Sequence, residues 1–448
     1  MDKLSNIKHI YFLGIGGIGM SALARFFVSN NYDVAGYDRT QSEVSLALEQ
    51  ASCEISYKNT LDAIPSLFRS PENVLVVYTP AIPEGNLILN YFKENGFSLC
   101  KRAEILGAIT KNSTCLAIAG THGKTTISSM LTYVLSDNNV DCSAFLGGIA
   151  TDFNSNLRIG TDNITVVEAD EFDRSFLQLF PNWALISSMD ADHLDIYVTA
   201  KGLEDSFRLF ADRVERGNLI AKEGLNVNAK YSYALNSITA NFSALNIRVE
   251  NGSYHFDINY PAGICENVIT GLPGIHNVEN ALATFAMAYV QGISVSGIIA
   301  SIASFSGVKR RFETHVKNEN HVYIDDYAHH PKEIEVAIIS ARDLYPKRKL
   351  TIVFQPHLYT RTRDFMNDFA KALSAADSVL LLDIYPAREL PIDGVNAEVL
   401  LSKIVCKEKS IVVKGQFPEI ILNSNLVMTL GAGDIYVLIQ PIKKALSL

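Results

Sequence analysis

Short apolar runs rich in valine and isoleucine alternate with amphipathic stretches along most of the chain. An apolar run bounded by turn residues predicts a buried β-strand, and apolar residues three and four positions apart predict a helix that packs on a sheet. Regular alternation of the two is typical of proteins in which helices cover a mostly parallel sheet. The predicted fold class is therefore α/β.

Glycine and proline residues divide this pattern into three blocks, 1–106, 107–307 and 308–448. A chain of 448 residues exceeds the size at which one hydrophobic core stops growing, so two or three domains are expected. The clearest strand segments are 9–14, 33–38, 73–80, 113–120, 163–170, 183–190, 321–331, 349–356, 378–386 and 425–435. Helices are predicted at 20–31, through about residue 136, from Pro331 and from about Arg363.

One stretch, Ala281–Val308, carries no charged residue and is long enough to span a bilayer. Five serines, Gln291, Gly292 and Gly297 interrupt it, however. Such breaks are typical of buried helices joined by a turn. We expect two buried helices that meet near Gly292, and no membrane partner.

Composition and charge limit the partners and the cellular compartment that are expected for this chain. The 39 Lys and Arg against 48 Asp and Glu give a net charge of −9, without the long basic stripe that binds a nucleic-acid backbone. The six cysteines lack the spacing of a zinc site or a disulfide scaffold, so reduced, mostly buried thiols are expected. The first residues show no signal-peptide pattern, which favours a cytoplasmic location.

A first glycine motif follows the first predicted strand. Gly14, Gly16 and Gly19 form G-x-G-x-x-G between a strand and a helix, where backbone amides at the helix start can bind a diphosphate. Asp38 ends the next strand, roughly where an acid that binds ribose would lie. The ligand can be a dinucleotide or any nucleotide diphosphate, and a turn that only packs a helix against a strand is the structural alternative.

A second glycine motif, GTHGKTT at 120–126, follows the strand 113–120. Gly120 and Gly123 allow backbone amides to face phosphate oxygens, Lys124 can reach the terminal phosphates, and Thr125 can bind magnesium. Ile118 replaces the first glycine of the usual phosphate-loop pattern. Strand, loop and helix nevertheless follow in the right order, so phosphate binding is favoured over a turn with a surface lysine.

Acids follow the next two predicted strands. Because ligands of open α/β sheets bind beyond the carboxyl ends of the strands, these side chains should gather around the second glycine motif. Oxygen ligands suit Mg²⁺, and a histidine can join as a softer ligand beside a second ion. Glu168 and His193 each come directly after an apolar strand, which favours a role in binding a cation over a solvated acidic loop. The acids and the histidine are Glu168, Asp170, Glu171, Asp173, Asp190, Asp192, His193 and Asp195.

Eight motifs together resemble the murein ligases. They occur in the order found in that family and cover nearly the whole chain, although no single one is decisive. The motifs are GIGGIGMSALA, GTHGKTT, EADEFDRSF, DADHLD, GIHNVENALA, RRFE, DDYAHHP and QPHLYTRTRDF.

The resemblance implies a Rossmann-like first domain for a UDP-sugar, a central P-loop ATPase-like domain for ATP, and a Rossmann-like third domain for an amino acid. The implied UDP-sugar residues are Gly14, Gly16, Gly17, Gly19, Asp38 and His122. The implied ATP residues are Gly120, Thr121, His122, Gly123, Lys124, Thr125, Thr126, Asn277, Asn280, Arg311 and Asp326. Tyr327, His329 and Arg361 are implied on the amino-acid side, and Thr125, Glu168 and His193 as Mg²⁺ ligands.

By the same resemblance the chain is an ATP-dependent ligase of peptidoglycan precursor synthesis. UDP-N-acetylmuramate and L-alanine are the implied substrates, which react through an acyl phosphate, and Lys124, His329 and Arg361 are the implied catalytic residues. A monomer or homodimer is expected.

Three positions depart from the family pattern. Leu358 replaces an arginine of many members, which leaves more of the binding of the amino-acid carboxylate to Arg361. Phe172 replaces a serine beside the acids. Arg208 lies where several relatives carry a modified lysine, so no such modification is expected.

Three alternatives remain. A sister ligase would attach a preformed peptide to the same UDP-sugar. A nicotinamide-dependent oxidoreductase would use the first glycine motif but leave the Lys124 motif without a role. A nucleotide sensor would bind ATP without turnover stimulated by an acceptor.

Overall fold

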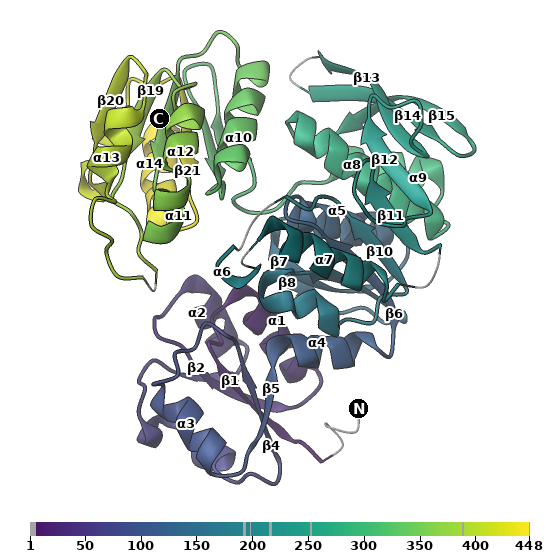
Figure 1. The fold of residues 1–448 in the computed structure, drawn as a ribbon, viewed down its shortest axis with the longest axis vertical. Helices are drawn as coiled ribbons and strands as arrows, with labels where there is room; N and C mark the ends of the chain where they lie inside the picture. The colour runs from purple at the N-terminus through teal and green to yellow at the C-terminus, as the bar shows by residue number, and fades with distance from the viewer. Residues whose placement is uncertain are drawn as a thin grey trace. The chain divides into compact units, whose positions relative to one another are not determined.

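The computed structural model describes residues 6–190, 194–197, 199–214, 217–250, 253–387 and 389–447. In it the chain forms three β-sheets, one after another in sequence, each accompanied by helices (Figure 1). The predicted α/β class with three domains is confirmed, and the limits 1–106, 107–307 and 308–448 stay a prediction.

The first sheet is a small parallel sheet of the Rossmann-like kind. Its order is β3-β2-β1-β4-β5, and each neighbouring pair is parallel. Apolar residues of the central strand β1 are fully buried because helices pack on both faces. Its strands are β1 (His9–Leu13), β2 (Asp33–Tyr37), β3 (Glu54–Ser56), β4 (Val74–Tyr78) and β5 (Ser98–Lys101), and its helices are α1 (Ile18–Ser29), α2 (Glu43–Gln50), α3 (Leu87–Glu94) and α4 (Arg102–Thr110), with 3₁₀ turns at Leu61–Ala63 and Ser66–Phe68.

The central sheet has ten strands in the order β15-β14-β13-β12-β11-β10-β6-β9-β7-β8. The pairs from β13 through β12, β11, β10, β6 and β9 to β7 are parallel, and β8 is antiparallel to β7. The strands are β6 (Thr114–Ala119), β7 (Ser143–Ala150), β8 (Ser155–Arg158), β9 (Ile164–Ala169), β10 (Trp183–Ile186), β11 (Leu219–Lys222), β12 (Tyr231–Leu235), β13 (Phe242–Glu250), β14 (Ser253–Tyr260) and β15 (Gly263–Thr270). The helices are α5 (Lys124–Asp137), α6 (Leu194–Tyr197), α7 (Ala200–Ala211), α8 (Ile275–Val290) and α9 (Val295–Ser304), with a 3₁₀ segment at Phe172–Gln178.

The third sheet has the order β16-β17-β21-β18-β19-β20, and only its edge strand β16 is antiparallel to its neighbour. Its three central strands are buried along their whole length, as expected where helices cover both faces. The strands are β16 (Glu313–Lys317), β17 (Val322–Asp326), β18 (Leu350–Phe354), β19 (Ser378–Leu381), β20 (Glu408–Ile411) and β21 (Leu426–Leu430). The helices are α10 (Pro331–Leu344), α11 (Tyr359–Asp364), α12 (Met366–Leu373), α13 (Ala397–Lys403) and α14 (Ile439–Leu446), with 3₁₀ turns at Lys414–Gln416, Glu419–Ile421 and Asp434–Leu438.

Two compact units divide the chain. The first contains the chain up to Leu245 together with Asp257–Val268 and Glu279–Ser306, and the second contains Asn246–Phe256, Ile269–Val278 and the chain from Gly307. All strands of the first sheet and most strands of the central sheet therefore belong to the first unit.

The uncharged stretch forms α8 and α9, and Gly292 between them has a left-handed φ of 82°. The prediction of two helices joined there is confirmed, but only α8 is mostly buried, since α9 buries Ile298, Ser301 and Ile302 alone. No helix of the described chain is both long and apolar enough to cross a bilayer. All six cysteines are free thiols, and four of them are buried.

The helix predicted from about Arg363 differs in the structure. It begins at Tyr359 and is two helices, α11 and α12, that meet at Phe365. By contrast α10 starts at Pro331 as predicted, because proline suits the first helical position and Glu333 accepts the backbone N–H of His330.

Phe176 anchors the segment after β9 in the core of the first unit. Its ring is fully buried, stacks on Phe210 at 4.9 Å and meets Phe207 edge-on at 5.2 Å. We expect Phe176→Ala to lower the free energy of unfolding by about 3–5 kcal/mol, because it removes a large buried side chain and leaves a cavity. Urea unfolding measures the loss.

Phe180 provides the matched control. It lies four positions further along, and 47% of it is exposed, so Phe180→Ala should change the free energy of unfolding by about 1 kcal/mol or less. Equal effects of the two substitutions would contradict the assignment of Phe176 to the core.

Candidate active site

The register of the central sheet brings three strand ends together. Ala119 at the end of β6 pairs with Ala169 at the end of β9 and with Ile186 at the end of β10. The second glycine motif, the acids after β9 and the serines after β10 therefore leave the sheet at one edge. This is the edge where open α/β sheets bind their ligands.

The second glycine motif depends on both of its glycines. Gly120 and Gly123 have φ angles of 134° and 80°, which side chains rarely allow. A Cβ on Gly120 would lie 2.0 Å from Ser187 Oγ, and one on Gly123 would lie 2.6 Å from Asn280 Oδ1. Any larger residue would displace the loop or these side chains.

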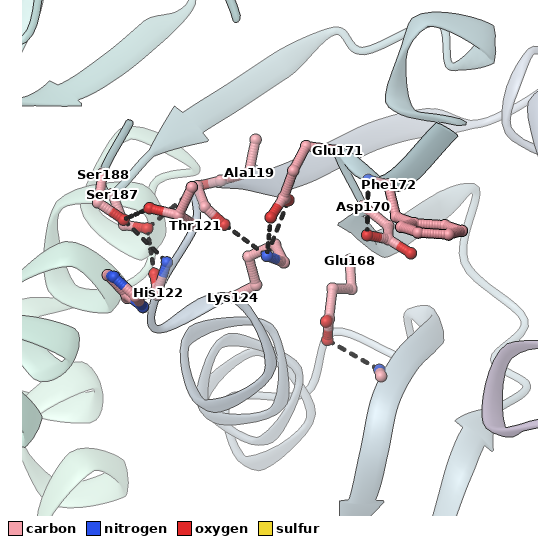
Figure 2. Close-up of polar contacts among 12 residues, drawn as sticks. Ala119, Thr121, His122, Lys124, Glu168, Asp170, Glu171, Phe172, Ser187 and Ser188 are labelled. Carbon is pink, nitrogen blue, oxygen red and sulfur yellow. Dashed lines mark hydrogen bonds and ion pairs between the residues drawn. The ribbon is translucent and has the colours of Figure 1, made fainter. Parts of the chain in front are cut away.

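Two serines after β10 fix the loop, and the sequence prediction missed both. Ser188 Oγ accepts the backbone N–H of His122 at 2.8 Å and lies 2.9 Å from Thr121 Oγ1 (Figure 2). Ser187 Oγ donates to the carbonyl of Ala119 at 3.2 Å and to that of His122. Their only sequence signal was a position directly after an apolar strand, beside the predicted acids.

Lys124 begins α5 and points back across the loop to the acids. Its Nζ donates to the carbonyl of Gly120 at 2.6 Å and lies 2.8 and 2.9 Å from the two carboxylate oxygens of Glu171 (Figure 2). The side chains of Lys124 and Glu171 are 13% and 1% exposed. Burial by itself lowers the pKa of Lys124, but the charges of Glu171, Asp170 and Glu168 outweigh it and raise that pKa. The lysine is therefore a buried, charged cation.

Glu168 and Thr125 supply oxygen ligands next to this lysine. Thr125 Oγ1 donates to Glu168 at 3.0 Å, and the backbone N–H of Gly147 donates to the other carboxylate oxygen at 2.8 Å. Burial raises the pKa of Glu168, while Lys124 and the two hydrogen bonds oppose that rise. A partly buried carboxylate beside a hydroxyl, at the start of a helix, fits Mg²⁺, which prefers oxygen ligands.

His193, the remaining predicted Mg²⁺ ligand, lies outside the described residues. Within the described ranges no group of three or more His, Cys, Asp or Glu side chains could by itself hold a metal ion. Thr125, Glu168 and His193 stay predicted ligands of Mg²⁺.

The predicted adenine-side asparagines lie in the first turns of α8. Asn280, 8% exposed, reaches the second glycine motif, because its Oδ1 lies beside Gly123. Asn277 Nδ2 donates to the carbonyl of Pro273 at 2.6 Å. The structure brings Asn280 to the motif, and the role of Asn277 stays a prediction.

The first glycine motif forms a tight turn between β1 and α1. Gly14 has a left-handed φ of 84° and donates its N–H to the carbonyl of Tyr37, and Gly17 is the N-cap of α1. Asp38 accepts the N–H of Gly16 at 2.7 Å and that of Arg39 at 2.7 Å. The predicted ribose acid therefore lies against the turn and binds one of its amides.

The third sheet gathers most of its predicted residues at one edge as well. Asp326 at the end of β17 pairs with Leu430, which pairs with Phe354. Asp326 accepts the N–H groups of Phe312 and Ala328, both at 2.7 Å, and burial raises its pKa to about 6. The guanidinium of Arg311 lies 5.4 Å from the ring of Tyr327.

His329 is held in one tautomer. Its Nδ1 lies 3.0 Å from the carbonyl of Tyr327 and 3.4 Å from Glu333. Because both groups are acceptors, Nδ1 carries the proton and Nε2 keeps a lone pair. Burial lowers the pKa of His329 to about 4, Arg361 adds to this, and Glu333 opposes it. The ring is therefore neutral at pH 7.

The segment with Leu358 and Arg361 follows β18. Leu358 has a φ of 71° and is the N-cap of α11, and Arg361 lies in that helix. A leucine in this conformation is strained, and such strain is found mostly at functional sites. Arg208 lies elsewhere, in α7, where it pairs with Asp205 at 3.1 Å and with Glu204.

Family models match three consecutive parts of the chain. The model of the Mur ligase family catalytic domain matches residues 9–114, that of the Mur ligase middle domain 118–288, and that of the Mur ligase glutamate ligase domain 310–439. In order, these ranges contain the first sheet, the central sheet apart from most of β6, and the third sheet.

Relatives match over the full length. The chain is 49% identical to the UDP-N-acetylmuramate–L-alanine ligase of Christiangramia forsetii, over 100% of this chain and 99% of that protein. It is 48% identical to the protein of the same name from Flavobacterium psychrophilum, over 99% of each. The structure of the UDP-N-acetylmuramate–alanine ligase of Thermotoga maritima superposes with a TM-score of 0.85 at 25% identity and covers 97% of this chain and 98% of that one.

Fold, glycine motifs and comparisons together define the class, a three-domain ATP-dependent ligase. Within that class the chain belongs to the Mur ligase family.

The buried neutral state of His329 predicts a pH dependence of stability. The pKa of His329 is about 4 in the folded protein, below the ordinary value of 6.5 for histidine, so its contribution to stability is complete above about pH 6.5 and is lost as the pH falls towards 4. The shift corresponds to at most about 3 kcal/mol. The advantage of the wild type over His329→Gln in free energy of unfolding should therefore shrink between pH 7.5 and 4, as measured by urea unfolding.

Measurements at pH 7.5 and 8.5 are the internal control, since the difference should be constant there. Parallel curves for wild type and variant down to pH 4 would show that His329 is not held neutral by burial.

Proposed function

We propose that the chain joins L-alanine to the lactyl carboxylate of UDP-N-acetylmuramate and converts ATP to ADP and phosphate. Full-length identity of 49% to a relative named for this reaction supports the proposal. The observation that carries it in the structure is the buried Lys124 ammonium, which faces a glycine loop with two left-handed residues. Such a loop binds the phosphates of a nucleotide.

The first step needs a cation between two anions. A lactyl carboxylate oxygen attacks the terminal phosphorus of ATP, the bond from that phosphorus to the bridging oxygen breaks, and ADP leaves. Lys124 and the amides of 120–126 offset the repulsion and stabilise charge on the transferred group. His122, in the same loop, is proposed to contact the sugar carboxylate.

Mg²⁺ bound with ATP would be held by Thr125, Glu168 and His193, and would supply neutralisation of phosphate charge. Asn280 beside Gly123 is proposed to contact the nucleotide, together with Asn277. Arg311 and Asp326 are proposed as nucleotide contacts from the third domain. The UDP-sugar is proposed to bind Gly14, Gly16, Gly17, Gly19 and Asp38.

In the second step the neutral amine of alanine attacks the acyl carbon and phosphate leaves. The nitrogen must lose a proton, and the free lone pair on His329 Nε2 makes this residue the proposed acceptor. Its low pKa makes it a weak base, suited to a proton that becomes acidic only as the new bond forms. Arg361 is proposed to bind the alanine carboxylate and Tyr327 to line the same site.

We also propose that the chain acts in the cytoplasm, as a monomer or homodimer. Its product would be a precursor of peptidoglycan.

Acceptor dependence tests the function. Purified protein with Mg²⁺, ATP, UDP-N-acetylmuramate and L-alanine should release phosphate only when both acceptors are present, and mass spectrometry should show the amide product. Phosphate release that ignores either acceptor would refute the proposal. A tripeptide used in place of alanine would indicate the sister ligase.

Lys124→Ala should lower the rate of amide formation by about 100- to 1000-fold, because one cation that stabilises the transferred phosphoryl group is lost. The affinity for UDP-N-acetylmuramate, measured by calorimetry, should stay within about threefold of the wild type.

The variant also leaves Glu171 buried beside no ammonium, which by itself destabilises a protein. Lys124→Ala combined with Glu171→Gln removes both charges and is the control for folding. If that double variant regained amide formation, Lys124 would have no catalytic role.

A further inference from the structure

A short acidic segment, residues 170–174, belongs to the same compact unit as the two glycine motifs. It follows β9, and its last two residues, Asp173 and Arg174, have left-handed φ angles of 53° and 54°. Two successive non-glycine residues in this conformation are strained and persist only when neighbouring contacts hold them. The contacts that hold this segment come from two directions.

Through Glu171 the segment contacts Lys124 of the proposed ATP site. Glu171 binds Lys124 through both carboxylate oxygens, and its own carbonyl accepts the hydroxyl of Tyr197. Asp170 turns back on the segment and accepts the N–H of Phe172 at 3.1 Å (Figure 2). The position of the Lys124 ammonium therefore depends on the conformation of this segment.

On the other side two cations of the first domain hold the segment. Lys101, at the end of β5, lies 2.9 Å from Asp173, and Arg102, at the start of α4, lies 3.5 Å from Asp170 through Nη2. The side chains of Arg102 and Asp170 are 21% and 38% exposed. These pairs connect the domain of the first glycine motif to the acids of the second.

The same arginine lies against the first glycine motif. A Cβ on Gly19 would be 2.7 Å from Arg102 Nη1 and 3.3 Å from its Cδ and Cζ, so the absence of a side chain at Gly19 leaves room for the guanidinium. A guanidinium is a planar fork that can bind anions along two edges. Nη2 binds Asp170, and Nη1 faces the first turn of α1.

We propose that Arg102 couples the two nucleotide sites. This rests on the proposed function, in which the diphosphate of the UDP-sugar binds the turn from Gly14 to Gly19. A diphosphate bound there contacts one edge of the Arg102 guanidinium and so stabilises the ion pair that the other edge forms with Asp170. The strained segment is then fixed in the conformation that presents Glu171 to Lys124, and ATP binds to a site that is already ordered. Arg102 is thus a positioning residue for the phosphoryl transfer.

Coupling of this kind is reciprocal and measurable by binding alone. Calorimetry gives the dissociation constant of a non-hydrolysable ATP analogue with Mg²⁺, first alone and then with saturating UDP-N-acetylmuramate. In the wild type the sugar nucleotide should tighten the analogue at least about fivefold, and the analogue should tighten the sugar nucleotide by the same factor. Arg102→Gln and Asp170→Asn should each bring the factor close to one, and the double variant should lower it no further.

Two further variants test whether the coupling needs the two-edged guanidinium of Arg102, rather than only its positive charge or any contact between the first domain and the central sheet. Arg102→Lys keeps the charge but has one ammonium in place of the fork, and should lose most of the coupling. Arg25→Gln removes another contact between the first domain and the central sheet, the 3.2 Å hydrogen bond from Arg25 to Ser155, and should keep the coupling. Thermal unfolding confirms that each variant is folded.

A wild-type factor of one, full coupling in Arg102→Gln or Arg102→Lys, or equal losses in Arg25→Gln and Arg102→Gln would each overturn the proposal. Failure of the proposed function has a different signature, since it means that the wild type forms no amide from alanine and the UDP-sugar. A wild type that forms the amide but shows no coupling would refute only the role of Arg102.

Discussion

A buried ammonium group at the start of a helix is the interaction on which the site depends. Burial and the positive end of the α5 dipole both disfavour a cation there, and Glu171, with Asp170 and Glu168 behind it, compensates for both. The ammonium of Lys124 also donates to the carbonyl of Gly120, so the lysine, the loop and the acids form one charged cluster.

The cluster exists because parallel strands end in register. Ala119, Ala169 and Ile186 are paired neighbours, so whatever follows them in sequence must meet at the same edge. The third sheet repeats this geometry with Asp326, Leu430 and Phe354. In both sheets, strands that end in register bring a set of polar groups to one edge. The set on the central sheet is suited to phosphate, and the set on the third sheet includes the neutral imidazole of His329 and the buried carboxylate of Asp326.

Most of the predicted residues of the second glycine motif could be found from the sequence, because a glycine loop after an apolar strand has few other uses. Ser187, Ser188 and Gly147 could not. Serine and glycine are common, and only the pairing of β10 and β7 with their neighbours brings these three to the loop and to Glu168. Arg102 was missed for the same reason, since 68 residues separate it from Asp170.

The sequence by itself determined the class of fold, the order along the chain of ten of the strands that the structure describes, and the chemical character of the two glycine motifs, because periodicity and glycine placement act through local backbone preferences. Tertiary structure alone decided the strand order within the sheets, the tautomer of His329, the pairing of Lys124 with Glu171 and the contact of Asp38 with Gly16. Each of these depends on which distant groups share a buried space, and local preferences contain no information about that.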